Sequence, residues 1–83
     1  MMRSPIAARA LGAVLLERER QDKRWGEQNH SPEKWVVILQ EEVGEFCREG
    51  LEGREEGMYR EAVQVAAVAL AMVECLERKR ERK

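Results

Sequence analysis

The chain has 83 residues, of which 43% are apolar, 37% are charged and 5% are aromatic, and its formal net charge is −1. This length allows one small domain (residues 1–83), and the composition fits an all-helical protein in water better than a β-sandwich or a disordered chain. The near-neutral charge argues against nucleic-acid binding, and the apolar stretch 62–73 is too short to cross a membrane.

A first helix is predicted to begin at Pro5, because Ser4-Pro5 combines an N-capping residue with proline at the first helical position. Apolar residues then recur at helical spacing as far as Leu15, before the charged segment 17–24. This start faintly resembles a signal peptide, but the apolar run is short and leads directly into charged residues. A helix followed by a loop over 26–30 is therefore the better interpretation.

A second helix is expected over residues 32–49, because Ser31-Pro32 repeats the capping signal and Gly50 follows. The connection after it is short and contains three of the six glycines of the chain. A third helix is expected to begin within 54–58 and to continue to about residue 80. The fold class is thus all-α, with three helices.

The middle of the third helix, residues 62–73, is apolar on every side. Such a helix must be covered all round, which two other helices of the same chain cannot easily do. We therefore expect a homo-oligomer, most simply a two-fold dimer that forms a larger helical bundle. The basic end, residues 78–83, is expected to be frayed. Cys47 and Cys75 lie far apart and are expected to be buried, reduced thiols of a cytoplasmic protein.

Glutamates cluster in the second helix, where Glu45 shares a helix face with both Glu41 and Glu42. Glu42 also falls in the middle of an apolar arc, and a carboxylate aimed at a core is costly unless it is paired or binds a cation. The members of that arc are Trp35, Ile38, Leu39, Val43 and Phe46. This placement points to a metal site inside a helical bundle.

The third helix supplies a second polar pair, Glu61 and Gln64, on the side that continues with its apolar residues. Carboxylates from two facing helices can build a metal site, and all-oxygen ligands suit Mg²⁺ or Mn²⁺. The alternative is a solvated acidic surface with arginine partners, for which Arg48, Arg54 and Arg60 are available.

The two acidic motifs resemble those of the MazG-like all-α nucleoside triphosphate pyrophosphohydrolases. Glu41-Glu42-x-x-Glu45 matches that family's E-E-x-x-E pattern, and after a spacer of fifteen residues Glu61-x-x-Gln64 is similar to its E-x-x-D pattern. The segment 24–32 also resembles a tryptophan-histidine-proline stretch that precedes the acidic helix in several members. The similarity covers roughly residues 17–77.

The resemblance implies Mg²⁺-dependent hydrolysis of a nucleoside or deoxynucleoside triphosphate to the monophosphate and pyrophosphate, by a dimer or tetramer that clears unwanted nucleotides. It makes Glu42, Glu45 and Glu61 metal ligands, and Glu41 either a further ligand or the residue that positions the attacking water. Gln64 replaces the family's aspartate, and its amide oxygen can still bind a cation although one negative charge is lost.

The nucleotide itself could be bound by Trp25, through stacking on a base, by His30, and by Lys23 and Arg24 at the phosphates. Each of these residues also has a structural interpretation, such as a hydrophobic lid for Trp25 and solvated surface for the two bases. The main rival to an enzyme is a non-catalytic helical dimerisation or regulatory module with a degenerate metal site. Mg²⁺ binding distinguishes the two.

Overall fold

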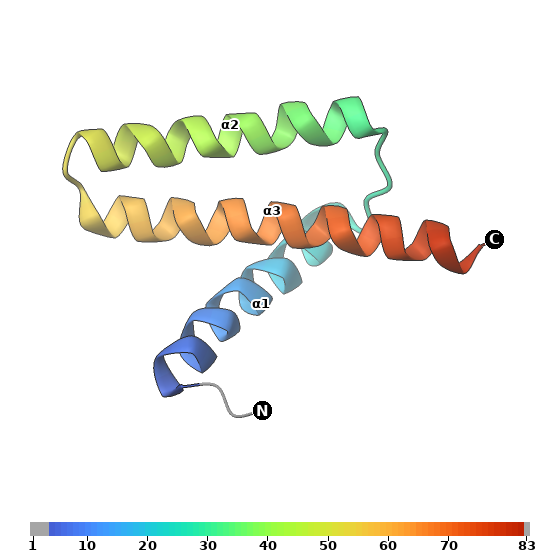
Figure 1. Ribbon diagram of the computed structural model, residues 1–83, viewed down its shortest axis with the longest axis horizontal. Coiled ribbons are helices and arrows are strands. Elements are labelled where there is room, and N and C mark those ends of the chain that lie inside the picture. The colour runs from blue at the N-terminus through green and yellow to red at the C-terminus, as the bar shows by residue number, and fades with distance from the viewer. Residues whose placement is uncertain (1–3, 83) are drawn as a thin grey trace.

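The computed structural model describes residues 4–82 and contains three α-helices and no strand within that range (Figure 1). They are α1 (Pro5–Trp25), α2 (Pro32–Leu51) and α3 (Glu55–Glu81). The all-helical class is confirmed. None of these helices is both long enough and apolar enough to span a membrane.

Side-chain caps fix the start of the first two helices, as expected from the sequence. The Ser4 hydroxyl accepts a hydrogen bond from the Ala7 N–H at 3.1 Å, and the Ser31 hydroxyl accepts one from the Lys34 N–H at 3.3 Å. Each cap satisfies one of the backbone donors that a helix leaves free at its N-terminus.

The turn between α2 and α3 comes later than the glycine pattern predicts. Gly50 lies inside α2, which continues to Leu51, and the chain reverses at Gly53, whose φ of 74° is in the left-handed region that favours glycine. Arg54 then binds the Glu49 carboxylate through Nε at 2.9 Å and Nη2 at 2.7 Å. That carboxylate packs against Gly57, where a side chain would collide with it.

α2 and α3 form an antiparallel hairpin, whereas α1 crosses α3 and diverges from the hairpin toward its N-terminus (Figure 1). Within the described residues, α3 packs against both other helices, and α1 and α2 do not pack against each other. α3 is therefore the central helix of the molecule.

The core lies mainly between α2 and α3. It consists of Trp35, Val68, Ala71 and Cys75, with Ile38, Leu39 and Met72 packed against it. Two expectations are corrected here, because Val43 is exposed, at 38%, and so is Cys47. Both residues lie on the side of α2 that α3 does not reach.

A buried arginine fastens α1 onto α3. Arg18, which is 8% exposed, donates to Glu74 of α3 at 2.5 Å and, within α1, to Asp22 and Gln21 at 3.0 Å each. A buried charge needs such partners. The hydrogen bond with Glu74 has the largest effect and keeps the pKa of Arg18 above its usual value. The pairing sets where the C-terminal half of α1 lies on α3.

Candidate metal centre and the adjoining groove

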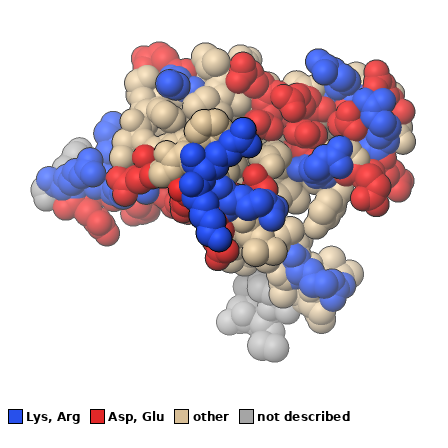
Figure 2. All heavy atoms as spheres, turned by 180° about the vertical axis from the view of Figure 1, so that it is seen from behind, with Lys and Arg blue, Asp and Glu red and all other residues tan. Residues whose placement is uncertain are grey.

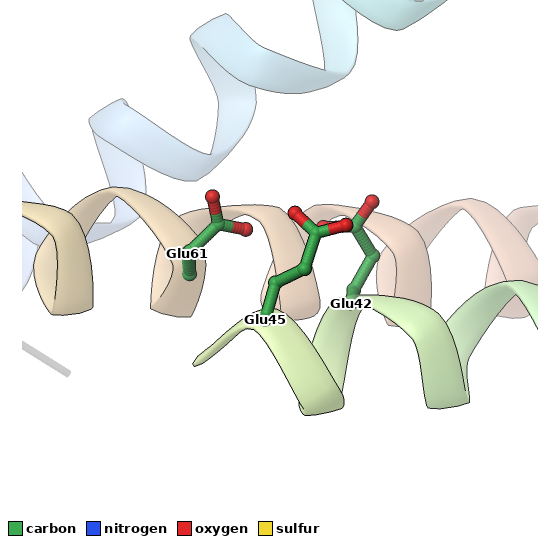
Figure 3. A group of neighbouring side chains, drawn as sticks. All are labelled: Glu42, Glu45 and Glu61. Atoms are coloured by element: carbon green, nitrogen blue, oxygen red, sulfur yellow. The ribbon is translucent and has the colours of Figure 1, made fainter. Parts of the chain in front are cut away.

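Three carboxylates from two helices converge on one point. Glu42 and Glu45 extend from α2 and Glu61 from α3, and one carboxylate oxygen of each lies within 4.8 Å of the others (Figure 3). We call this set the carboxylate cluster. The hairpin creates it, because Glu42 and Glu45 occupy successive turns of α2 and α3 runs antiparallel beside them.

Among the members of the carboxylate cluster, Glu42 has a raised pKa. Burial raises the pKa of Glu42 to about 7, with further increases from the charges of Glu45 and Glu61, from a hydrogen bond with Glu61 and from the charge of Glu41. At neutral pH this carboxyl group is therefore close to half protonated, first because it is partly buried and second because other carboxylates surround it.

Within the part of the chain that the structure describes, no basic side chain forms an ion pair with these carboxylates. Among residues 4–82, the ion pairs do not include any member of the carboxylate cluster, and Arg54 is engaged with Glu49 and Glu52 instead. In addition, Glu61 Oε1 is buried without a hydrogen-bond partner. The predicted alternative of an acidic surface neutralised by arginines therefore finds no support at these three residues.

The donor set suits a hard cation. Oxygen ligands at converging positions are what Mg²⁺ and Mn²⁺ prefer, and a divalent ion would offset the repulsion and give the buried Glu61 oxygen a partner. The residues present thus fit the predicted metal, with Glu42, Glu45 and Glu61 as ligands.

The two other predicted ligands lie outside this set of atoms. Glu41 is exposed on α2 and does not join the carboxylate cluster, although its charge contributes to the raised pKa of Glu42. Gln64 is half-buried on α3, one turn after Glu61, and lines the same groove as Glu42.

A groove of about 1210 Å³ extends from Glu42 toward the α1–α2 loop. All four residues predicted to bind the nucleotide line it, together with Glu42 and Gln64 from the predicted metal site. Those four residues are Lys23, Arg24, Trp25 and His30. Segments far apart in the sequence thus contribute to one concave surface, as a ligand site requires.

The aromatic side chains of the groove differ in burial. Trp25 is 61% exposed, and the Arg24 guanidinium lies 4.9 Å from its ring centroid. His30 is half-buried and meets Trp35 edge to face, with ring centroids 4.8 Å apart. Trp35 is 3% exposed, which confirms its predicted place in the core. Trp25 is therefore an open surface and not a lid over the core.

The groove has further lining residues that the sequence patterns did not single out, among them Arg20 and Lys34. Lys34 could have been noticed because it lies in the first turn of the predicted second helix, between the loop that contains His30 and the core residue Trp35. Arg78, from the segment expected to be frayed, lies in α3 and donates to the Gln28 carbonyl at 2.8 Å and to Asn29 Oδ1 at 3.1 Å. No helix periodicity reports such a contact with a loop.

The chain was also compared with known proteins. No protein family, no curated protein and no solved structure matched it.

Proposed function

We propose that this protein hydrolyses a nucleoside or deoxynucleoside triphosphate to the monophosphate and pyrophosphate in a Mg²⁺-dependent reaction. The observation that carries the proposal is the carboxylate cluster, which has no basic partner among residues 4–82 and includes one oxygen that is buried there without a hydrogen bond. It stands beside a groove large enough for a nucleotide. The resemblance of the two acidic motifs to the MazG-like pyrophosphohydrolases supplies the reaction.

Glu42, Glu45 and Glu61 would hold the ion, with the Gln64 amide oxygen and Glu41 as further candidates. When bound, Mg²⁺ supplies charge neutralisation for the phosphates and activation of a water molecule. The chain's own part is to orient the substrate, through the basic and aromatic residues at the far end of the groove, and to accept a proton on a carboxylate of the cluster.

The proposed working form is a cytoplasmic homo-oligomer, either a dimer or a tetramer. The accessible surface of the chain is 6554 Å², whereas a compact monomer of its mass exposes about 5,100 Å². The excess is within the range that each subunit contributes to an obligate homodimer. The radius of gyration, 14.1 Å, also exceeds the value of about 12 Å for a compact domain of this length.

The test is an assay of pyrophosphate release from a panel of canonical and modified nucleotides with Mg²⁺ or Mn²⁺. We expect release by the wild-type protein and its loss, by at least a hundredfold, in Glu45→Gln, because one charge of the metal site is removed. Glu19→Gln, an exposed acid of α1, is the matched control and should keep full activity. Equal activity of both variants would refute the assignment of the cluster.

A non-catalytic dimerisation or regulatory module is the second candidate, and Gln64 favours it by removing one charge from the cluster. Titration with Mg²⁺ separates the two functions. Binding to the native state raises the melting temperature, so a working site predicts stabilisation that Glu45→Gln abolishes. No shift in the wild-type protein, together with no pyrophosphate release, would favour the module.

A further inference from the structure

The groove changes its chemical character along its length. On α2 its lining residues follow one another as Lys34, Trp35, Ile38 and Glu42, and Gln64 of α3 lies at the Glu42 end. The groove is therefore acidic at Glu42, apolar in its middle and basic at the end that contains Lys34. Lys34 and Glu42 are eight residues apart, which is about 12 Å along a helix. That distance is comparable to the length of an extended nucleoside monophosphate.

The basic end combines Lys34 with three residues from the last turns of α1, namely Arg20, Lys23 and Arg24. Figure 2 shows basic side chains gathered in the middle of one face of the molecule, beside a strongly acidic region. Lysine and arginine side chains donate hydrogen bonds and do not accept them, so these four residues favour ligand groups that accept hydrogen bonds.

Several hydrogen-bond acceptors at this end are engaged by the protein. One oxygen of Glu17 accepts from Arg20 at 2.8 Å, and one oxygen of Glu27 accepts from Asn29 at 2.8 Å. The amide oxygens are engaged as well, since Gln21 accepts from Arg18 and Gln28 contacts His30.

The donors of the two lysines, by contrast, are free. Within the described part of the chain, neither Lys23 nor Lys34 takes part in an ion pair or a side-chain hydrogen bond with another residue. The ammonium groups of both lysines are therefore available to a ligand.

We propose that this end of the groove reads the outer edge of the nucleobase and selects bases that present a carbonyl oxygen there. These are the 6-keto purines, guanine and hypoxanthine, and the 4-keto pyrimidines, uracil and thymine. Adenine and cytosine place an amino group at the same position, so a lysine ammonium faces another donor. The inference rests on the proposed function, because it takes the triphosphate to lie at the carboxylate cluster.

The geometry agrees with this orientation. With the phosphates at the Glu42 end, the sugar and base extend over the apolar middle formed by Ile38, Val68 and Ala71, where burial of a flat ring is favourable. The base edge then reaches the level of Lys34. Both lysines are exposed, so a mismatched base loses a charge-assisted hydrogen bond without leaving a buried group unpaired. The expected selectivity is therefore about one order of magnitude.

Two substrate pairs test this base edge, since dITP differs from dATP, and dUTP from dCTP, in the keto or amino group and in the proton on the neighbouring ring nitrogen. We expect kcat/KM to favour the keto member of each pair by about tenfold or more. Lys34→Gln should reduce that preference several-fold, because an amide both donates and accepts. Lys79→Gln, an exposed lysine outside the groove, should leave it unchanged.

Binding of the products tests the inference even if no substrate is hydrolysed. Quenching of tryptophan fluorescence by dIMP should require a lower concentration than quenching by dAMP, and Lys34→Gln should bring the two together. Equal affinities for dIMP and dAMP would overturn the inference whether or not the protein is an enzyme. So would weaker binding of inorganic pyrophosphate in Lys34→Gln without any difference between the bases, since phosphates would then occupy this end.

Discussion

Glu42 keeps its proton to a higher pH in the folded protein than in the unfolded chain, where a glutamate titrates at about 4.5. Between that value and about 7 the native state holds more protons than the unfolded state, so the free energy of unfolding falls as the pH rises through this window. The contribution is about 1 kcal/mol once the partial exposure of the side chain is allowed for. The loss is about half complete near pH 7 and complete about one unit above it.

Removing that carboxylate should reverse the effect. In the absence of divalent ions, we expect Glu42→Gln to melt at a higher temperature than the wild-type protein at pH 8, and to differ little from it at pH 4. Thermal melts followed by circular dichroism across pH 4–8 measure this, with Glu19→Gln as the control. If the melting temperatures of Glu42→Gln and wild type changed in parallel with pH, the pKa of Glu42 would not be raised in the folded protein.

Gln64 offers the opposite change. Gln64→Asp adds a carboxylate one turn after Glu61, and we expect the dissociation constant for Mg²⁺ to fall by about tenfold. Without the ion, the extra charge should lower the melting temperature at pH 8. Calorimetric titration with MgCl₂ measures the first effect. An unchanged or weaker affinity would mean that residue 64 points away from the ion.

Among the elements, the loop between α1 and α2 is held by the C-terminal part of α3. Arg78 binds Gln28 and Asn29, while Glu27 lies 3.4 Å from the same guanidinium. We expect Arg78→Gln to speed amide hydrogen exchange over residues 27–30 and to raise KM more than it lowers kcat, because the groove wall loosens while the carboxylate cluster is untouched.

Arg80→Gln is the matched control, since Arg80 pairs only with Glu77 of its own helix among the described residues. It should leave both the exchange rates and KM unchanged. Equal effects of the two substitutions would mean that the loop responds to the overall charge of the helix end and not to the contacts made by Arg78.

The elements also show how far sequence reasoning extends. Ser4-Pro5 and Ser31-Pro32 predict helix starts because a cap is a local contact, and the acidic motifs predict the convergence of Glu42, Glu45 and Glu61 because helix periodicity fixes their faces. The end of α2 was missed because the reversal depends on Gly53 and on Arg54 reaching back to Glu49. The place of α1 depends on Arg18 and Glu74, 56 residues apart, and no periodicity reports such a pair.

At the scale of the whole molecule, many large apolar side chains face outward from all three helices. We expect a mass of at least twice 9.6 kDa in sedimentation equilibrium at micromolar concentration. The reason is that the accessible surface of each chain exceeds that of a compact monomer by an amount within the range that a subunit buries in an obligate homodimer. A monomer over the whole concentration range would leave these residues without a partner copy. The exposed side chains include Ile6, Leu11, Leu15, Leu16, Val36, Val37, Leu51, Tyr59, Val73 and Leu76.

The attachment of α1 to α3 alone has a consequence for partial unfolding. Helix α1 and the hairpin of α2 and α3 can unfold as two separate cooperative units. The reason is that α1 contacts only α3 of the hairpin among the described residues, and that the polar contacts between the two units depend on Arg18 and Arg78. The groove needs both units, whereas the carboxylate cluster needs only the hairpin. In mild urea, nucleotide binding should therefore disappear before Mg²⁺ binding does, and the first transition should be reported by Trp25 while Trp35 stays buried.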